Sequence, residues 1–314
     1  MQPLFGPYGS ASIHHAADIL AAGGDACWFH MFDPAVFDAC ARHGLAACVE
    51  FKTFRADFDQ HPELIPIGID GRPIRYGDLV QGVCLSQTEF LEATAQALRD
   101  GVRTYQPAGI WLDYLTYAGW FEEPQPDLQQ SCFCRACVAD FCQATAIDAT
   151  DPQQIVAEHL AAWTHHKCRR IAGFAAEYAA IIRTAQPGCM IGAYMCPWIP
   201  TEFDQALTRI FAQDYTMLAP AIDIFTPLMY GEKSGRPTSW GREFLEAAPQ
   251  FVPADRRVQL ILDARDGPDS LTHTAAATAP SYGLQVFDGA RIFSDTTLTR
   301  AFADAVSHIR SRLV

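Results

Sequence analysis

The sequence has little positive charge and no long hydrophobic run. Of its 314 residues, 23 are Lys or Arg and 36 are Asp or Glu, so the formal net charge is −13. A protein that binds nucleic acid needs a stripe of basic side chains to neutralise phosphates, and no such stripe is present. No apolar run approaches the roughly 20 residues that cross a bilayer. We therefore expect neither nucleic acid nor a membrane as a partner.

Several catalytic motifs are absent as well. The sequence contains no G-x-S-x-G turn of a serine hydrolase and no G-x4-G-K-[ST] phosphate loop. A dinucleotide-binding fold would carry a G-x-G-x-x-G turn after an early strand, whereas Gly23-Gly24 precedes a strand. Nothing therefore supports a serine hydrolase, a nucleotide triphosphatase or a dinucleotide-binding enzyme.

The start of the chain and its cysteines bear on the compartment. Met1-Gln2-Pro3-Leu4 lacks the basic and apolar regions of a signal peptide. Without an export signal, eleven cysteines are typical of reduced thiols in a cytosol, or of metal ligands. We expect a cytoplasmic protein.

Eight short apolar runs alternate with helical stretches. The runs have strand length and no polar alternation, as expected for parallel strands that helices cover. Eight such units predict an α/β fold, a (β/α)8 TIM barrel, in a single domain over residues 1–314; a doubly wound sheet is the alternative. The predicted strands are Leu4–Tyr8, Ala26–Met31, Ala46–Phe51, Gly109–Asp113, Met190–Met195, Asp223–Tyr230, Val258–Asp263 and Gly283–Phe287.

The predicted helices lie between these strands. The clearest begins near Asp151-Pro152, where Asp suits a cap and Pro a first turn, and ends at Pro187-Gly188. The others are Ala11–Ala22, Pro34–His43, Gln87–Tyr105, Thr201–Ala212, Arg236–Ala248, Ser270–Ala279 and Thr296–Leu313.

Two connections are longer than the roughly 2–6 residues of a plain barrel turn. Residues 52–86 follow strand three and residues 114–151 follow strand four. Both leave the carboxyl ends of strands, where barrel enzymes place their active sites. We expect these long loops to wall a substrate cleft; decoration or a contact in a homo-oligomer is the alternative.

Four of the predicted strands finish in a carboxylate. An ionised group after a buried run is costly unless it finds partners, water or substrate at the barrel mouth. Ion pairs with nearby Lys52, Arg265 or Arg291 are the alternative. The four strand-end carboxylates are Glu50, Asp113, Asp263 and Asp288.

Paired carboxylates are the machinery of glycoside cleavage, in which one group protonates the leaving oxygen and the other attacks or activates water. Asp113 and Asp263, on strands four and seven, should face each other across the mouth. We predict Asp113 as nucleophile or stabiliser and Asp263 as acid/base, with Glu50 and Glu232 in reserve.

Side chains at the strand ends also suit a sugar. Aromatic faces stack on the C–H surfaces of a sugar while polar groups bind its hydroxyls. The predicted substrate-binding residues are His30, Tyr114, Trp120, Trp198, Tyr230 and Glu232.

The segment Gly109-Ile110-Trp111-Leu112-Asp113, followed by Cys132-Phe133-Cys134-Arg135-Ala136-Cys137 and Phe141, resembles the hypothetical glycoside-hydrolase-like barrel proteins. In that family a strand-four D-G-I-x-x-D precedes a C-x-C-x-x-C…F knuckle. Residues 223–230 are similar to the strand-six D-x-x-x-P-M-x-Y segment of related proteins, and residues 83–86 also resemble the family. The resemblance implies a barrel hydrolase acting on glycosides, with Asp113 as nucleophile or key acidic residue. Ala108 departs from it, since the family usually has Asp there.

The cysteine knuckle could hold a structural zinc. Cys132, Cys134 and Cys137 place three soft ligands close together, and a tetrahedral zinc needs a fourth, which Cys84 or Cys142 could supply. Reduced thiols or a loop disulfide are the alternatives. We expect no cofactor to be required for the reaction itself.

Three classes of function remain open from the residues. The first is a glycoside hydrolase with a carbohydrate substrate between the long loops. The second is a non-catalytic carbohydrate-binding barrel, whose acids only bind hydroxyls. The third is a divalent-metal-dependent sugar isomerase or lyase, with a metal held by oxygen and imidazole ligands. Its ligands would be His30, Glu50, Asp263 and Glu232.

Overall fold

Parallel strands arranged around a barrel form the centre of the computed structural model, which describes residues 1–75 and 82–313. Their order around the barrel is β1-β9-β8-β6-β5-β4-β3-β2, and every strand pair is parallel. The predicted (β/α)8 barrel is confirmed. The strands are β1 Leu4–Pro7, β2 Ala26–His30, β3 Ala46–Lys52, β4 Gly109–Asp113, β5 Met190–Met195, β6 Ile224–Met229, β7 Arg257–Val258, β8 Leu260–Asp263 and β9 Gly283–Phe287.

The seventh barrel position is a divided strand. Gln259 separates β7 from β8, and both segments pair with β6. The Gln259 side chain donates to the carbonyl oxygen of Leu4, at 2.9 Å. The predicted run Val258–Asp263 therefore covers one barrel position in two pieces.

The barrel closes between β1 and β2 by a few contacts. A parallel bridge joins Tyr8 to Trp28, and the Gly9 amide donates to the Trp28 carbonyl at 2.8 Å. Asp25 exchanges two hydrogen bonds with Phe5, one through its amide and one through its carboxylate. This seam leaves the barrel nearly closed.

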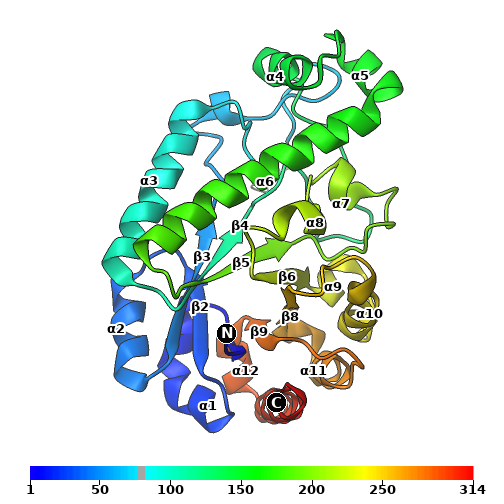
Figure 1. Cartoon of the computed structure of the whole chain (residues 1–314). Helices are drawn as coiled ribbons and strands as arrows, with labels where there is room; N and C mark the ends of the chain where they lie inside the picture. The colour runs from blue at the N-terminus through cyan, green and yellow to red at the C-terminus, as the bar shows by residue number, and fades with distance from the viewer. Residues whose placement is uncertain (76–81, 314) are drawn as a thin grey trace.

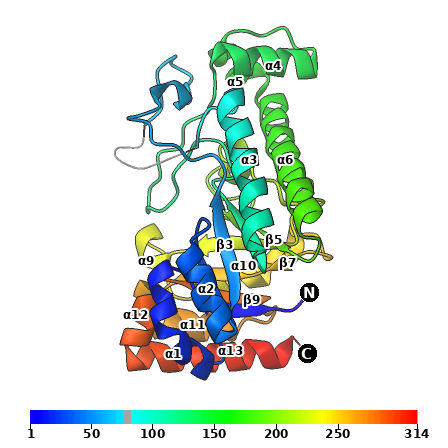
Figure 2. The same ribbon diagram turned by 90° about the vertical axis from the view of Figure 1, so that its left-hand side faces the viewer.

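Helices surround the barrel, as Figures 1 and 2 show. Those near the amino-terminal half are α1 Ala16–Ala21, α2 Pro34–His43, α3 Thr88–Tyr105, α4 Arg135–Thr145, α5 Pro152–Glu158 and α6 Leu160–Ala185. The remainder are α7 Ala206–Arg209, α8 Tyr215–Leu218, α9 Gly231–Ser234, α10 Trp240–Ala247, α11 Pro268–Ala275, α12 Gly289–Ser294 and α13 Thr296–Arg312. Short 3-10 turns occupy Ser10–His15, Pro62–Leu64, Ala248–Gln250 and Ala264–Asp266.

Five predicted helices differ in the structure. The helix expected over Arg236–Ala248 begins later, as α10, and the one expected over Ser270–Ala279 ends earlier, as α11. The long helix expected from Asp151 is divided at His159, whose φ of −129° ends α5 before α6 begins. The helix expected over Thr201–Ala212 shrinks to α7, because residues 203–205 adopt positive φ angles that a helix cannot contain. The helix expected over Ala11–Ala22 begins as the 3-10 turn Ser10–His15 and becomes α1 at Ala16.

Two hydrophobic layers hold the barrel. Side chains that point outward pack beneath the helices, among them Phe5, Val49 and Leu112. Side chains that point inward fill the barrel, where Trp28 and Trp111 pack edge to face with ring centroids 5.3 Å apart. The filled interior leaves space for a ligand only at the ends of the strands.

The long loop after β4 carries α4 and α5 above one end of the barrel, beside the loop after β3 (Figures 1 and 2). Residues 76–81 of the predicted loop 52–86 lie outside the described residues. Helix α6 runs from this region down the side of the barrel and packs against α3.

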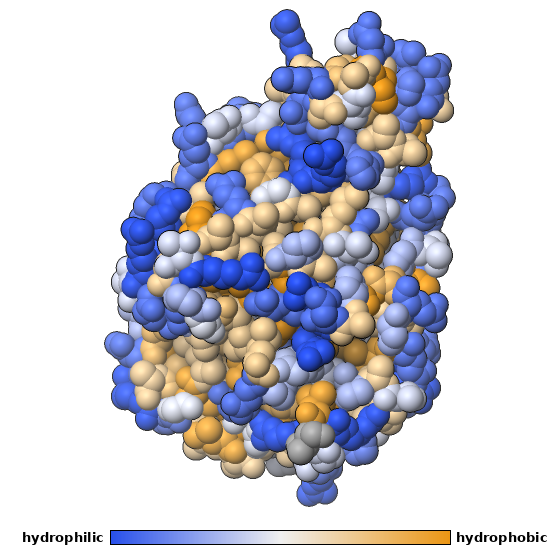
Figure 3. All heavy atoms as spheres, in the orientation of Figure 1, coloured by the Kyte–Doolittle hydropathy of each residue, from blue (hydrophilic) through white to orange (hydrophobic). Residues whose placement is uncertain are grey.

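Hydrophilic side chains cover much of the face seen in Figure 3, and apolar residues lie among them. Figure 3 shows hydrophilic residues around a paler band along the middle of one face, and exposed alanines of α6 lie on the helix that crosses this face. The exposed large hydrophobic side chains are Met1, Leu20, Ile69 and Phe203. Within residues 1–75 and 82–313, the helices are all too short or too polar to span a bilayer.

Gly6→Ala should destabilise the seam between β1 and β2. A Cβ at Gly6 would lie 1.8 Å from the Ala26 carbonyl oxygen, a main-chain atom that cannot rotate away. We expect a loss of about 3 kcal/mol or more in the free energy of unfolding, at or above the upper end of ordinary overpacking. Urea denaturation followed by circular dichroism measures the loss.

The matched control is Gly173→Ala in α6. No atom lies within 4 Å of a Cβ at this exposed helical glycine, so the change should be neutral or gain up to about 1 kcal/mol. Equal stability of the two variants would contradict the close approach at the seam.

Candidate active site

A pocket opens at the carboxyl ends of the barrel strands, with a cavity volume of about 190 Å³. Residues from the ends of β3, β4, β5, β6 and β9 form its floor, and the loop after β4 forms one wall. It is lined by Tyr8, Glu50, Lys52, Asp113, Tyr114, Thr116, Gly119, Trp120, Phe121, Glu122, Tyr194, Cys196, Phe211, Gln213, Leu228, Tyr230, Lys233, Ile261 and Phe287.

Glu50 is a buried carboxylate on the floor of this pocket, with an exposed fraction of 5%. The hydroxyl of Tyr8 donates a hydrogen bond to its Oε2 atom. The Lys52 ammonium lies 3.5 Å from its Oε1 atom. The Glu50 carboxylate thus has a hydrogen-bond donor at one oxygen and a positive charge near the other.

Asp113 ends β4, the strand next to β3, and its carboxyl group contacts that of Glu50 within hydrogen-bonding range. Burial raises the pKa of Asp113 well above its usual value, and the neighbouring Glu50 charge raises it further. The Tyr114 amide and Lys52 oppose this rise in the pKa of Asp113 only in part. Asp113 therefore holds a proton to a higher pH than an ordinary carboxyl group does.

The chain turns sharply after Asp113. Tyr114 has a φ of 54°, in the left-handed region that non-glycine residues rarely occupy. Such a conformation is held only where surrounding contacts impose it, and it often marks a functional site. The turn places the Tyr114 side chain in the pocket wall beside Asp113.

Asp263 lies apart from this pair. It is 2% exposed, and its carboxylate accepts hydrogen bonds from the Arg265 guanidinium at 2.5 and 3.0 Å and from the Arg265 amide at 3.0 Å. The described residues that line the pocket do not include Asp263. The structure thus gives Asp113 a different carboxyl neighbour, Glu50, from the one that the sequence predicted.

The predicted substrate-binding residues divide into two groups. Tyr114, Trp120 and Tyr230 line the pocket. Trp198 is 1% exposed and packs beneath the wall, with its ring centroid 6.4 Å from Phe121 and 5.6 Å from Phe211, both of which line the pocket.

His30 and Glu232 lie elsewhere. His30 lines a separate groove that it shares with Lys52 and Arg55. Glu232 is exposed, and its amide donates to Asp266 at 2.7 Å. Neither residue is among those that line the pocket in the described part of the chain.

Sequence reasoning missed several pocket residues. Glu122, in the loop after β4, forms an ion pair with Lys233 of α9, and the Lys233 ammonium lies 2.5 Å from the Glu122 carboxylate. Lys233 also lies 4.8 Å from the Tyr230 ring centroid and 5.6 Å from that of Phe287. Phe287 ends β9 and could have been found from the strand-end rule. Glu122 lies in the loop 114–151 expected to wall the cleft, but no local motif singles it out within that loop.

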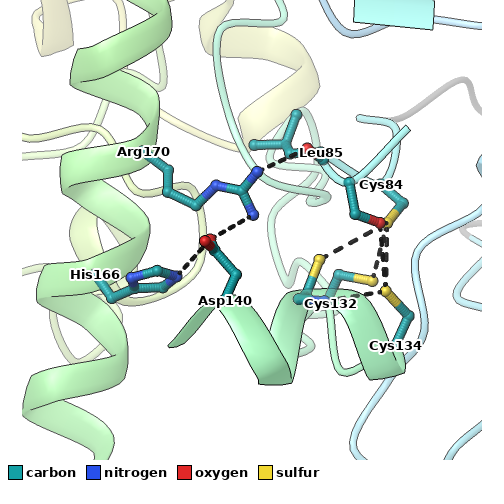
Figure 4. Close-up of polar contacts among 9 residues, drawn as sticks. Cys84, Leu85, Cys132, Cys134, Asp140, His166 and Arg170 are labelled. Carbon is teal, nitrogen blue, oxygen red and sulfur yellow. Dashed lines mark hydrogen bonds and ion pairs between the residues drawn. The ribbon is translucent and has the colours of Figure 1, made fainter. Parts of the chain in front are cut away.

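Four cysteines form a compact cluster outside the pocket: Cys84, Cys132, Cys134 and Cys137, with sulfur atoms all within 4.8 Å of one another. The Cys84 sulfur lies 3.5, 3.6 and 3.8 Å from those of Cys132, Cys134 and Cys137 (Figure 4). A disulfide has a bond of about 2.05 Å, so these thiols are free. Zinc bonds of about 2.3 Å to four tetrahedral thiolates separate the sulfurs by about 3.8 Å. The group could therefore hold a metal such as zinc.

The cluster joins both long loops. Cys84 lies in the loop after β3, and the other three cysteines lie in the loop after β4 or at the start of α4. Cys142, the other candidate for a fourth ligand, lies apart and donates its thiol hydrogen to the Ala149 carbonyl at 3.3 Å.

Charged contacts attach this region to α6, as Figure 4 shows. Asp140 on α4 lies 3.1 Å from Arg170 and 3.3 Å from His166, both on α6. Arg170 also donates to the Leu85 carbonyl at 2.7 Å, next to Cys84. These contacts attach the segments that carry the cysteine cluster to helix α6.

Comparison by sequence finds no matching family model, and none of the curated proteins matches either. Comparison by structure finds glycoside hydrolases. The glycoside hydrolase domain of PgaB (BpsB) from Bordetella bronchiseptica is 11% identical, with a TM-score of 0.72 over 98% of this chain and 99% of that domain. A β-galactosidase from the Antarctic haloarchaeon Halorubrum lacusprofundi is 13% identical, with a TM-score of 0.66 over 99% of this chain. One from Bacillus circulans is 11% identical, with a TM-score of 0.67 over 99% of this chain.

This likeness defines a class by its fold. The chain has the barrel fold of these glycoside hydrolases. Its strand order agrees with that fold, and its pocket lies at the strand ends. It spans 58% and 56% of the two β-galactosidases but nearly all of the PgaB domain.

The raised pKa of Asp113 predicts an unusual dependence of stability on pH. In the unfolded chain Asp113 loses its proton near pH 4, whereas the folded protein retains it to a higher pH. The folded state then binds more protons, so the free energy of unfolding should fall as pH rises through this interval. Asp113→Asn removes the titration, so the stability of this variant relative to wild type should increase by about 1.4 kcal/mol for each pH unit within the interval.

Chemical denaturation between pH 4 and pH 8 measures this difference. Asp263→Asn is the control, and we expect it to destabilise the protein. It weakens the ion pair with Arg265 and should lower the free energy of unfolding by about 1–3 kcal/mol at neutral pH. Parallel pH profiles for wild type and Asp113→Asn would show that the pKa of Asp113 is not raised.

Proposed function

We propose that this protein is a glycoside hydrolase whose general acid is Asp113. The observation that carries the proposal is the contact between Glu50 and Asp113 at the floor of a pocket in a glycoside-hydrolase barrel. A carboxyl group that keeps its proton beside one that is ionised is the pairing that acid catalysis at a glycosidic bond requires.

In this proposal Asp113 gives its proton to the glycosidic oxygen as the bond from that oxygen to the sugar breaks. Its raised pKa maintains the protonated form near the working pH, which is the condition for an efficient general acid. The leaving alcohol takes the proton. Water then adds to the sugar carbon and gives one proton back to the Asp113 carboxylate, which restores the acid.

Glu50 has the complementary role. Lys52 and Tyr8 stabilise its negative charge, and that charge would stabilise the positive charge that develops on the sugar ring. The electrostatic effect of a fixed charge is larger where the charged group is buried, as Glu50 is.

The aromatic side chains would hold the sugar. Tyr114, Trp120 and Tyr230 line the pocket, and their faces suit the C–H surfaces of a pyranose ring. The substrate class that follows is a carbohydrate, in keeping with the glycoside hydrolases of the same fold.

The proposal moves the acid role from Asp263 to Asp113. Asp263 forms an ion pair with Arg265. It also caps the 3-10 turn Ala264–Asp266, because its side chain accepts a hydrogen bond from the Arg265 amide. Asp263 also does not line the pocket in the described part of the chain, so we assign it to the support of the strand end.

A carbohydrate-binding barrel without catalysis is the second candidate. Glu50 and Asp113 are in hydrogen-bonding contact, which is closer than the roughly 5–5.5 Å between the carboxyl groups of a retaining pair. The metal-dependent isomerase has no such observation in its favour: the four cysteines are the metal-ligating group found among residues 1–75 and 82–313.

We also propose that the four cysteines bind one structural zinc. Their spacing matches a tetrahedral thiolate site, and three of the four cysteines are buried. A zinc here would cross-link the two loops that flank the pocket and take no part in proton transfer.

Asp113→Asn tests the catalytic proposal. We expect kcat to fall by about 10²–10⁴-fold on disaccharides, the usual contribution of a general acid. The loss should be smaller on nitrophenyl glycosides, because nitrophenolate leaves with little need of a proton. A reducing-sugar assay and nitrophenol release measure the two substrate classes.

Asp263→Asn is the control and should retain most of its turnover once its folding is verified. Undiminished disaccharide cleavage by Asp113→Asn would refute the role of Asp113. Binding of saccharides by the wild type without cleavage of any would favour the second candidate.

Metal analysis tests the zinc proposal. The purified protein should contain about one equivalent of zinc per chain by plasma emission spectroscopy, and Cys84→Ser should lose it. Cys142→Ser, outside the cluster, should retain the full equivalent. Zinc below half an equivalent in the wild type, or unchanged in Cys84→Ser, would contradict the site.

A further inference from the structure

A second groove lies next to the pocket, at the ends of β2 and β3. It has a cavity volume of about 540 Å³ and is lined by His30, Met31, Lys52, Arg55, Ala56 and Asp57. Lys52 lines both the groove and the pocket. Arg55 lies 6.0 Å from the ring centroid of Tyr114, which lines the pocket. A substrate in the pocket could therefore extend into the groove.

The groove gathers positive charge in a protein whose formal net charge is −13. Lys52 and Arg55 carry that charge, and among residues 1–75 and 82–313 only Lys52 has a carboxylate within 4 Å, Glu50 at 3.5 Å. Arg55 forms no ion pair with any residue in the described ranges. An arginine without a carboxylate at the edge of a cavity has its planar set of donors available for a ligand.

Asp57, the acid in the groove, is bound elsewhere. Its Oδ1 atom accepts the amides of Asp59 and Gln60 at 3.0 and 3.3 Å, and its Oδ2 atom accepts the Gln60 side chain at 2.9 Å. These bonds tie the Asp57 carboxylate to its own turn and not to Arg55.

His30 lies in the same groove as these two cations, and its pKa is lowered. Partial burial lowers its pKa to about 4, with Lys52 and then Arg55 adding to the effect. At neutral pH His30 is therefore uncharged, and one ring nitrogen can donate a hydrogen bond while the other accepts one. The groove thus combines two cations and a neutral histidine with one carboxylate, Asp57, which is bound by its own turn.

We propose that this groove binds an anionic group carried by the saccharide substrate, such as a carboxylate or a sulfate. The inference rests on the proposed glycosidase function and specifies the substrate class as an acidic saccharide. Arg55 would bind two oxygens of the anion through its fork of N–H donors, while Lys52 and His30 contact the remaining face. The sugar that bears the anion would lie beside the bond that Asp113 protonates.

The test compares neutral and acidic substrates in matched pairs. Nitrophenyl galactoside and glucoside are assayed beside the corresponding uronides and 6-sulfated glycosides, so that the arms distinguish a carboxylate from a sulfate. We expect one anionic arm to exceed its neutral partner in kcat/KM by about tenfold or more, the size of a charge-assisted hydrogen bond.

Arg55→Gln should remove that preference by raising KM for the anionic substrate about tenfold, with kcat and the neutral substrate little changed. The matched control is Arg72→Gln in the same loop, because the Arg72 side chain is 85% exposed and does not line the groove. Equal kcat/KM in all arms, or an Arg55→Gln variant with unchanged KM, would overturn the inference and leave the glycosidase proposal intact.

A binding experiment separates the two proposals further. The methyl glycosides of the same sugars are titrated into Asp113→Asn by calorimetry. Tighter binding of an anionic glycoside, lost on adding Arg55→Gln, supports the groove even if no glycoside is cleaved, in which case only the glycosidase proposal fails. Binding without preference for charge would overturn the groove as an anion site.

Discussion

The contact between the carboxyl groups of Glu50 and Asp113 is the constraint on which the mouth of the barrel depends. Strands β3 and β4 are neighbours in the sheet, and Glu50 pairs with Trp111, two residues before Asp113. Residues two apart on a strand point to the same face, so the two carboxyl groups share a face of the sheet. Two carboxylates in contact and shielded from water repel each other strongly, and one of them must keep its proton. Burial and the neighbouring Glu50 raise the pKa of Asp113 well above its usual value, so Asp113 is the group that keeps the proton. The chemistry that we propose follows from this unequal sharing.

The walls of the pocket are held from two sides. The cysteine cluster joins the loops after β3 and β4, and the contacts of Asp140 with α6 hold this junction in place. On the other side, the ion pair of Glu122 with Lys233 connects the loop after β4 to α9. Long loops lose much conformational entropy on ordering, so such cross-links are what allows them to form a defined wall.

Much of the barrel could be predicted because its signals are local. Buried parallel strands read as short apolar runs, and β4 and β5 have the bounds that the sequence predicted. Helix α2 also matches, since Asp33 caps its start and Gly44, with a φ of 70°, ends it. The break at His159 and the left-handed residues 203–205 have no such local signal, because packing between distant segments imposes them.

The sequence by itself determined which side chains reach the barrel mouth. Parallel strands all end on the same side, so a carboxylate that ends a strand, such as Asp113, can be assigned there without a structure. Only the tertiary structure decided the distant partners: Glu50 beside Asp113, and Cys84 in place of Cys142 in the cysteine cluster. Such partners are tens of residues apart in sequence, and strand register and loop packing bring them together. Composition and the spacing of motifs do not determine which of these residues meet.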